Sequence, residues 1–435
     1  MKIAIIGSGI SGNAAAWALA TSTRHDLTIY EKGSTIGGHS ATVDVDYDGR
    51  RIPVDTGFIV FNELNYPNFH ALLTLLGVRT QRSDMGFSLS SRGGAFEWAG
   101  REKNVIVGFL ARKRNLISPR HFHMLYEMFR FNRQAIADRK ADRLGRLSLH
   151  AYLDTHKFSQ RFRRDYLLPM AAAIWSMPMA RILDFPAASF VAFFDNHRLL
   201  HWTRPSWRTI SGGSREYVAE LITPFRDRIR LNCGVTRVIR HDLGVDVADS
   251  SGRHERFDHV IIAAHSDQAL AMLDEPTPLE RSALSAIAYR DNDVYLHRDP
   301  RLMPKRRAAW AAWNVIDTGE PGASPSVTYW MNALQNIDPS RPLFVSLNPP
   351  VEPEPSLVFG RYVYAHPQYD SAAVAAQQKL GAIQGHGGVW YCGAWTGYGF
   401  HEDGCSSGLA VAERLGARVP WRGATSAPAL AIAAE

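Results

Sequence analysis

Three glycines near the start of the chain have the spacing of a phosphate-binding turn. Gly7, Gly9 and Gly12 lie in GSGISG, in the order G-x-G-x-x-G. The first glycine permits a tight bend, the second lets a pyrophosphate approach the backbone, and the third lets a helix pack closely on a strand. Ile10 and Ser11 fall where a helix begins, and free N–H groups there attract phosphate oxygens. We therefore predict a dinucleotide site that includes these five residues.

A carboxylate stands where such a site contacts a ribose. Glu31 comes nineteen residues after Gly12 and ends the stretch HDLTIYE. A carboxylate at this place accepts hydrogen bonds from both ribose hydroxyls and disfavours a 2′-phosphate. We assign Glu31 and its neighbour Lys32 to the cofactor site.

The elements expected around these residues are those of a nucleotide-binding βαβ unit. KIAIIG, residues 2–7, is short and mostly β-branched, which predicts a buried parallel strand. NAAAWALA, residues 13–20, predicts a helix with small residues toward the sheet, and HDLTIYE predicts a second strand. The start of the chain therefore predicts an α/β fold.

A second glycine pair distinguishes between dinucleotides. Gly37 and Gly38 precede His39, whereas a nicotinamide domain normally continues directly into its next helix. An Asp-Thr-Gly sequence follows at 55–57. With its strand-end Glu, Gly-Gly pair and Asp-x-Gly strand, the chain resembles the FAD-binding amine oxidase and phytoene desaturase superfamily, which implies FAD as the cofactor. The residues that this resemblance assigns to FAD are Gly37, Gly38, His39, Thr56 and Gly57.

The C-terminal region carries the same resemblance. It predicts a strand over 389–392, a glycine-rich loop, and a helix over 405–416 with its cap at Ser406 or Ser407. In the superfamily this arrangement closes the flavin site. It implies that Asp403 holds a ribityl or phosphate-linked hydroxyl and that N–H groups around Gly404 and Cys405 face the flavin pyrimidine edge. The residues assigned to FAD here are Gly393, Asp403, Gly404 and Cys405.

The middle of the chain is expected to complete the FAD domain. GVTRVIR resembles the superfamily strand that brackets the adenine, with Val235 and Val238 as candidates. We predict an α/β protein with a Rossmann-type FAD-binding domain and an inserted α+β substrate domain, in the two-domain arrangement of amine oxidases and glutathione reductase. The FAD domain is assigned residues 1–75, 207–275 and 376–420, the substrate domain 76–206 and 276–375, and a tail 421–435.

The inserted segments are expected to form the substrate side. The first is predicted to be largely helical, and both are rich in Trp, Met and Phe, which indicates an apolar route to the flavin. Amine oxidases of the superfamily commonly place a lysine near flavin N5. The comparable strand here, 288–299, contains none, and Lys305 comes after it. The flavin carries the redox chemistry, and the residues considered for a catalytic role are Asn292, Asp293 and Trp330.

A basic segment lies within the first insertion. From Arg101 to Asp165 there are sixteen Lys or Arg against six Asp or Glu, and the whole chain carries a net charge of +7. This segment is either a solvated face or a contact for an anionic partner such as a phospholipid surface. Residues 118–145 predict a helix that either packs in the core or dips into a bilayer beside its arginines. Its two apolar faces contain Phe122, Leu125 and Phe129, and Met124, Met128 and Phe131.

Composition excludes several classes of protein. The chain is 46% hydrophobic and 21% charged, which is typical of a globular enzyme. Three cysteines without a Cys-x-x-Cys pair predict a reducing compartment, and His121-x-His123 alone is no metal motif. We see no secretory signal, membrane helix or nucleic-acid-binding motif. We expect no metal, no nucleic acid partner, and a cytoplasmic location that includes the periphery of the inner membrane face.

Several stretches, among them GGHSATVDV and YWMNALQ, resemble a bacterial subgroup of predicted NAD/FAD-binding proteins. This subgroup is associated with cyclopropane-fatty-acid-synthase-like methyltransferases, and some relatives modify methylated acyl chains on the route to furan fatty acids. The resemblance implies a lipid acyl chain as substrate, dehydrogenated by hydride transfer to flavin N5, and a lipid methyltransferase as partner. Three alternatives stay open: a flavin-dependent amine oxidase, a reductase of a methylene-lipid, and a non-catalytic flavin-binding partner of a methyltransferase.

Overall fold

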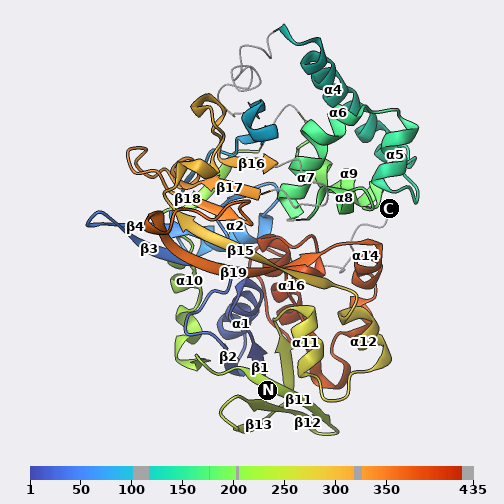
Figure 1. Ribbon diagram of the computed structural model, residues 1–435. Coiled ribbons are helices and arrows are strands. Elements are labelled where there is room, and N and C mark those ends of the chain that lie inside the picture. Colours follow the sequence, from blue (N-terminus) through green and yellow to red (C-terminus); the bar gives the residue numbers. More distant parts are fainter. Residues whose placement is uncertain (101–116, 176, 202–204, 318–325, 424–435) are drawn as a thin grey trace.

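A parallel sheet of five strands lies at one end of the protein (Figure 1). The structure is a computed structural model, which describes residues 1–100, 117–175, 177–201, 205–317 and 326–423. The order of the parallel sheet is β10-β2-β1-β14-β20. The central strand β1 is almost entirely buried, because both faces of a parallel sheet are covered. The strands predicted at the start and near the end of the chain are confirmed. The five are β1 (Lys2–Ile6), β2 (Asp26–Tyr30), β10 (Ile229–Arg230), β14 (His259–Ile262) and β20 (Val389–Tyr391).

The two ends of the chain meet on this sheet. Helix α1 (Ile10–Ser22) packs against helix α16 (His401–Arg414). A Cβ on Gly408 would lie 2.1 Å from the carbonyl oxygen of Ser11, so the absence of a side chain there lets the helices approach closely. Beyond α16, Trp421 stacks on Trp17 with ring centroids 5.7 Å apart.

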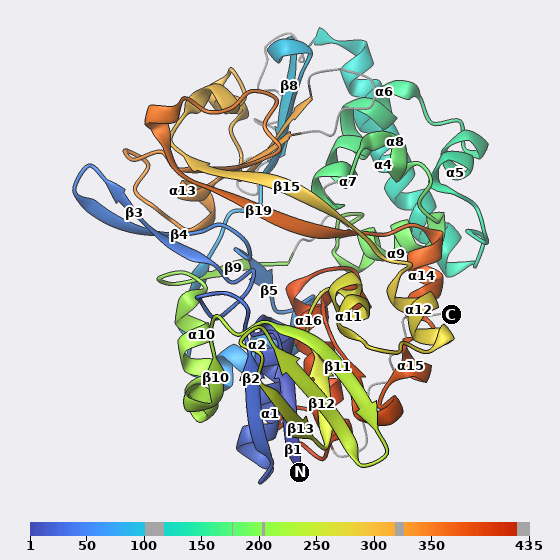
Figure 2. The ribbon, with the colours of Figure 1, turned by 60° about the horizontal axis from the view of Figure 1, so that its bottom comes forward.

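Smaller elements surround this core. An antiparallel sheet of three strands, β11-β12-β13, lies beside the parallel sheet (Figures 1 and 2). The hairpin β3–β4 and the sheet β5-β9-β6 lead toward the other half of the protein. These strands are β3 (Thr42–Tyr47), β4 (Arg50–Asp55), β5 (Phe61–Asn62), β6 (Thr80–Arg82), β9 (Trp207–Ile210), β11 (Val235–His241), β12 (Gly244–Asp249) and β13 (His254–Phe257). The helices are α2 (Pro67–Leu75), α10 (Arg215–Leu221), α11 (Ser266–Met272), α12 (Pro278–Leu284), α14 (Ser371–Gln377) and α15 (Leu380–Ile383).

A sheet of seven strands forms the other half of the protein. Its order is β19-β15-β18-β17-β16-β7-β8, and only the pair β7–β16 is parallel among the described residues. The long strands β15 and β19 run across the protein above the parallel sheet (Figure 1). The seven are β7 (Phe87–Ser91), β8 (Phe96–Gly100), β15 (Ala288–His297), β16 (Trp313–Asp317), β17 (Ser326–Trp330), β18 (Phe344–Leu347) and β19 (Val358–Gln368), and the short helix α13 (Met331–Leu334) follows β17.

Helices cover one side of this second sheet (Figure 2). The expectation that 76–206 is largely helical is wrong for its first part, because residues 80–100 form strands and β7 and β8 pair into the large sheet. The longest helix, α4, begins at Pro119, and the hydroxyl of Ser118 caps it by accepting the N–H of His121. The helices are α4 (Pro119–Lys140), α5 (Leu149–Thr155), α6 (Gln160–Phe162), α7 (Leu168–Trp175), α8 (Met179–Ile182) and α9 (Ala187–Asn196), with a π-turn at Arg163–Leu167.

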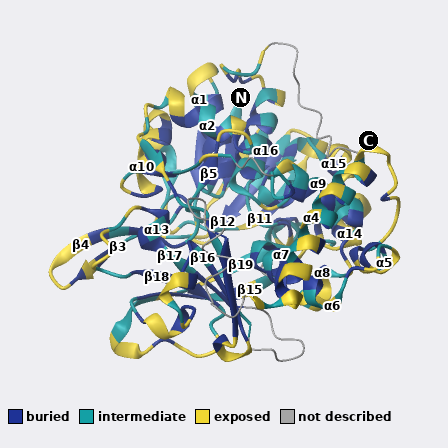
Figure 3. Ribbon diagram, turned by 90° about the horizontal axis from the view of Figure 1, so that it is seen from above, coloured by how far each residue is buried: buried dark blue, intermediate teal, exposed yellow. Residues whose placement is uncertain are grey.

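These elements confirm the predicted fold class, a Rossmann-type α/β unit with an inserted α+β unit. All five strands of the parallel sheet come from 1–75, 207–275 and 376–420, and all seven strands of the large sheet come from 76–206 and 276–375. Buried residues concentrate where sheets and helices meet, and exposed residues gather on the β3–β4 hairpin and the outer helices (Figure 3). No helix among the described residues is long and apolar enough to cross a membrane.

Candidate cofactor and active site

The predicted phosphate-binding turn joins β1 to α1, and its glycines meet different surroundings. A Cβ on Gly7 would lie 2.5 Å from the carbonyl oxygen of Ala263, and one on Gly12 would lie 2.0 Å from the carbonyl oxygen of Gly7. A Cβ on Gly9 would meet no atom within 4 Å. Gly9 is the N-cap of α1, whose first-turn N–H groups have no partner within the helix. The turn therefore offers open space and a positive helix end, as a pyrophosphate requires.

The side chains of Ile10 and Ser11 do not face this space. Both residues are buried, and they lie against Gly404 of α16. Only their backbone, at the start of α1, is placed to contact a phosphate.

Glu31 lies directly beyond β2 and beside the glycine turn. One carboxylate oxygen accepts the N–H and the hydroxyl of Ser8 at 2.9 and 2.5 Å, and the other accepts the N–H of Gly33 at 2.7 Å. Because Ser8 stands between Gly7 and Gly9, the carboxylate and the turn belong to one site. The neighbouring Lys32 is exposed.

The loop before β11 runs along the backbone of Glu31. The N–H of Cys233 donates to the carbonyl of Glu31 at 2.8 Å, and the N–H of Asn232 donates to the carbonyl of Gly33 at 2.9 Å. Val235, at the start of β11, is half-buried and follows this contact closely. Val238 is 1% exposed, and its carbonyl accepts the N–H of Asp274. Of the two predicted adenine contacts, Val235 is therefore the one with free surface beside Glu31.

The second glycine pair folds back onto the first turn. The N–H of Gly37 donates to the carbonyl of Ser8 at 3.0 Å. A Cβ on Gly38 would lie 3.2 Å from the Cα of Gly9. Gly37 and Gly38 have φ of 119° and 57°, which favour glycine. The structure thus brings together the two glycine motifs that lie far apart in the printed sequence.

The Asp-Thr-Gly stretch holds the loop of His39 in place. A Cβ on Gly57 would lie 2.2 Å from the carbonyl oxygen of His39, which accepts the N–H of Phe58 at 2.8 Å. The hydroxyl of Thr56 hydrogen bonds with that of Tyr364 at 2.8 Å. Gly57 therefore supports the loop by close packing, and Thr56 connects it to β19.

The C-terminal helix begins earlier than the sequence predicts. It starts at His401, so Ser406 and Ser407 lie inside it, and Gly416 follows its end. The N–H of Gly404 donates to the carbonyl of Phe400 at 3.2 Å. The expectation that N–H groups at Gly404 and Cys405 face the flavin is therefore wrong, because the groups that the helix leaves free are those of 401–403.

Asp403 accepts hydrogen bonds from the turn before its own helix. One carboxylate oxygen accepts the N–H groups of Tyr398 and Phe400 at 3.1 and 2.8 Å, which fixes the turn that begins the helix. Burial raises the pKa of Asp403 to about 7. Gly393 and Cys405 are buried, and the N–H of Gly393 donates to the hydroxyl of Ser407 at 3.0 Å. Asp403 therefore shapes the helix start whose N–H groups are free for a cofactor.

An unpartnered nitrogen lies beside these loops. Nε2 of His39 is buried and has no hydrogen-bond partner among the described residues. Burial lowers the pKa of His39 to about 3, so the imidazole is neutral. A buried polar atom without a partner is costly, and a bound ligand would satisfy it. This nitrogen, the open space at Gly9 and the carboxylate of Glu31 fit FAD, which spans both a pyrophosphate and a ribose.

Histidines and tyrosines from three segments gather around His39. Its ring centroid lies 5.0 Å from that of Tyr364, 6.0 Å from His366 and 6.3 Å from His265. His265 stacks on Tyr289 with centroids 4.4 Å apart. Burial lowers the pKa of His366 to about 4 and that of His265 below its ordinary value. The cluster therefore contains three imidazoles that burial keeps neutral.

The catalytic candidates separate in space. Asn292 is fully buried, and its amide donates to the carbonyl of Tyr364 and to Nδ1 of His366 at 3.2 and 3.1 Å. Asp293 points out of the sheet, and its half-exposed side chain pairs with Arg361 at 2.9 Å. Trp330 packs on Arg307 and Trp310, outside the histidine cluster. Only Asn292 joins the site.

His265, His366 and Tyr364 belong to this cluster although no sequence motif predicted them. The alternation of Tyr362, Tyr364 and His366 along β19 places them on one face, and that signal is present in RYVYAHPQ. The pairing of β15 with β19, which sets Asn292 opposite Tyr364, involves residues 72 positions apart and has no local signal.

An apolar wall lies between the helices and the large sheet. Met170 and Ile174 share one face of α7, which packs against β16. These side chains and the rings of Phe87, Trp313 and Tyr329 remain half-buried while they pack on the main core. Trp313 and Tyr329 meet edge to face at 4.8 Å. Helix α7 and the large sheet therefore share an apolar surface whose side chains the protein covers only in part.

Aromatic rings connect this wall to the cofactor end. Trp175, at the end of α7, lies 4.7 Å from Phe193 of α9. Phe193 lies 5.3 Å from Phe400 and 5.6 Å from Tyr398, just before α16. The apolar contacts therefore continue to the turn that Asp403 fixes.

Comparisons with known proteins agree with this geometry. The sequence profile described as flavin containing amine oxidoreductase matches residues 10–294. Among curated proteins, none has significant similarity to the sequence. Three solved structures share the fold over 95% of this chain. They are a CLA-producing fatty acid isomerase from P. acnes (16% identity, 98% of that chain, TM-score 0.65), a cyclohexylamine oxidase from Brevibacterium oxydans (17%, 99%, 0.66), and a wild-type putrescine oxidase bound to putrescine (14%, 99%, 0.66).

Proposed function

The chain belongs to the flavin-containing amine oxidoreductases and is an FAD-dependent oxidoreductase, and we propose that it dehydrogenates an acyl chain of a membrane lipid. The observation that carries the proposal is the apolar wall of α7 and the large sheet, continued by Phe193 to the start of α16. Such a surface suits a hydrocarbon chain, which offers no charge or hydrogen bond for recognition.

Dehydrogenation breaks two C–H bonds and forms one C=C bond, so a hydride and a proton leave the substrate. FAD, when bound, accepts the hydride equivalent and returns the electrons to an acceptor. The proton leaves to solvent. Burial lowers the pKa of His39, His265 and His366, so these imidazoles would pass a proton on rather than hold it. Apolar side chains around the acyl chain would exclude water from the reacting carbon atoms.

The sequence resemblance refines this proposal. It favours a methylated acyl chain, on the route to furan fatty acids, supplied by a lipid methyltransferase at the cytoplasmic face of the membrane. The likeness to a fatty acid isomerase supports an acyl chain as the bound group, at 16% identity.

Amine oxidation is the second candidate. The family name and the two amine oxidases of similar fold favour it. Against it, β15 carries Asn292 and no lysine, and Lys305 lies beyond that strand, against Gly94 and Glu97.

An anaerobic titration decides between the candidates. The yellow protein is mixed in turn with a methylated phospholipid, an unmethylated phospholipid, and a primary amine, and the flavin absorbance is followed. We expect bleaching by phospholipid and none by the amine. Bleaching by the amine alone would overturn the proposal, and no bleaching by any of the three would favour a reductase or a non-catalytic role.

A variant tests the apolar wall directly. Ile174→Lys places a charge among the half-buried apolar side chains, and we expect it to slow bleaching by phospholipid while FAD stays bound. The matched control is Leu243→Lys on the exposed β11–β12 turn, which should bleach as the unchanged protein does. Equal rates in both variants would show that the acyl chain takes another route.

A further inference from the structure

Helix α4 stands at the edge of the protein farthest from the parallel sheet (Figure 1). Its inner side packs in the main core through Met124, Phe131 and Ala135, each with 0% exposure. The core-packing interpretation of this helix is therefore right for one side only, because its other side carries large exposed apolar residues.

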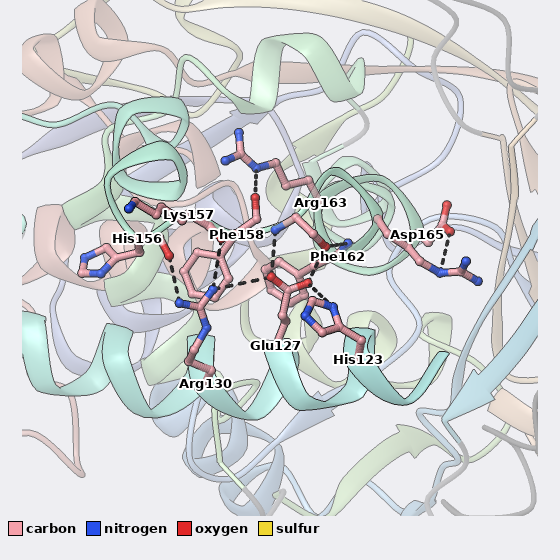
Figure 4. Close-up of polar contacts among 11 residues, drawn as sticks. His123, Glu127, Arg130, His156, Lys157, Phe158, Phe162, Arg163 and Asp165 are labelled. Atoms are coloured by element: carbon pink, nitrogen blue, oxygen red, sulfur yellow. Dashed lines mark hydrogen bonds and ion pairs between the residues drawn. The ribbon is translucent and has the colours of Figure 1, made fainter. Parts of the chain in front are cut away.

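The two acidic residues of α4 both turn inward. Glu127 accepts the N–H of Ser159 at 2.8 Å and the hydroxyl of the same residue, with Arg130 and His123 beside it (Figure 4). Asp138 accepts the hydroxyl of Tyr152 at 2.9 Å. Both side chains are 3% exposed or less, so neither presents its charge to solvent.

The opposite side is aromatic and cationic. Ile117, Phe122, Tyr126 and Phe129 are 81%, 51%, 61% and 42% exposed. Phe122, Tyr126, Phe129 and Arg133 follow one another at helical spacing, so they form one stripe. We call this stripe, with Ile117 and the exposed Lys140, the α4 outer face. It carries basic charge and no acidic side chain.

We propose that the α4 outer face docks on an anionic phospholipid bilayer. Charge complementarity carries the choice of partner, because the helix buries both of its acids and exposes Arg133 and Lys140 on this face. Phe and Tyr side chains insert at the level of the lipid headgroups, with Arg and Lys beside them, in helices that lie in the membrane plane. A second copy of this chain would instead set like charges against each other.

The position of α4 links such a surface to the candidate active site. Helix α4 packs against α9, and Phe193 of α9 reaches Phe400 and Tyr398. A bilayer at the outer face would therefore lie beside the helices that line the apolar wall. The docking surface stands on the charge and exposure of α4, whichever substrate the flavin oxidises.

Co-sedimentation of the FAD-loaded protein with vesicles tests the proposal. Vesicles of phosphatidylcholine alone are compared with vesicles containing phosphatidylglycerol, at low and high salt. We expect binding to the anionic vesicles, weaker at high salt because the attraction is screened. Phe122→Ala/Tyr126→Ala should lower the partition coefficient by roughly tenfold or more. Arg133→Gln/Lys140→Gln should lower it by about fivefold per charge.

Two control variants each remove one exposed side chain of the same kind, apolar or basic, at the opposite end of the protein. Leu243→Ala removes an 86% exposed apolar side chain, and Arg24→Gln removes an exposed charge. Neither should alter binding. The proposal is overturned if the protein ignores anionic vesicles, if the controls weaken binding as much as the α4 variants do, or if the α4 variants only change the self-association measured by ultracentrifugation. Flavin bleaching by detergent-dispersed lipid is a separate readout, so a failure of docking is distinguishable from a failure of the proposed reaction.

Discussion

Single residues in the glycine turn separate cofactor binding from folding. A Cβ on Gly9 meets open space, whereas a Cβ on Gly12 would collide with the carbonyl of Gly7. Gly9→Val should therefore fold with nearly unchanged thermal stability yet bind no FAD, because its side chain would fill the position of the pyrophosphate. Flavin absorbance of the purified protein and the thermal midpoint of the apoprotein check the two parts.

Gly12→Ala is the matched control for this prediction. Its added methyl group meets backbone, which cannot move aside as a flexible side chain can, so the apoprotein itself should lose stability. Gly9→Val protein that retains stoichiometric FAD would contradict the assignment of the turn.

Residues of this kind could be predicted because their chemistry depends on local sequence. The glycine turn and Glu31 lie in one continuous βαβ stretch, and strand and helix boundaries there follow from composition. His366 and Tyr364 could not be placed, because their contact with His39 depends on strand pairings and loops that join distant segments.

Among the elements, the start of α16 shows why the sequence misleads. Glycines 404 and 408 and the acids before them have the composition of a loop. They lie in a helix that packs closely on α1. A Cβ at either glycine would collide with Ile10 or Ser11 of α1, so this packing requires glycine at both positions. Asp403 starts the helix by accepting N–H groups from the turn before it. Tertiary contact has thus overridden local propensity.

Glu402 of the same helix joins α16 to α2. Its carboxylate accepts the N–H groups of Asn68 and Phe69 at 3.0 and 2.9 Å and the side-chain amide of Asn68 at 2.6 Å, at the start of α2. Glu402→Gln would turn an NH₂ group toward one of these donors. We expect the free energy of unfolding to fall by about 1–3 kcal/mol. The thermal midpoint should be lower with FAD absent as well as present. Glu63→Gln, at a 65% exposed side chain, should have no effect, and an equal loss in both variants would contradict the argument.

At the scale of the whole molecule, Asp55 connects the two halves. Its carboxylate accepts the hydroxyl of Thr42 at 2.6 Å, the N–H and hydroxyl of Ser214 at 2.9 and 2.8 Å, and the amide of Gln335 at 3.1 Å. Ser214 precedes α10 near the parallel sheet, and Gln335 follows α13 beside the large sheet. One buried carboxylate therefore holds segments of both halves together.

The protonation of Asp55 should make the stability of the protein depend on pH. Burial raises its pKa from 3.8 to about 6, so the folded state binds the proton more tightly than the unfolded state. The free energy of unfolding should then fall by about 3 kcal/mol as the pH rises from about 4 through about 6. Asp55→Asn cannot titrate and turns an NH₂ group toward donors, so it should be less stable than the unchanged protein. Its deficit in thermal midpoint should be largest at pH 4.5 and smallest at pH 7.5, whereas the exposed control Asp242→Asn should show no such trend. A deficit that grows with pH would mean that the four donors keep Asp55 ionised throughout, and the carboxylate would then join the two halves as an anion.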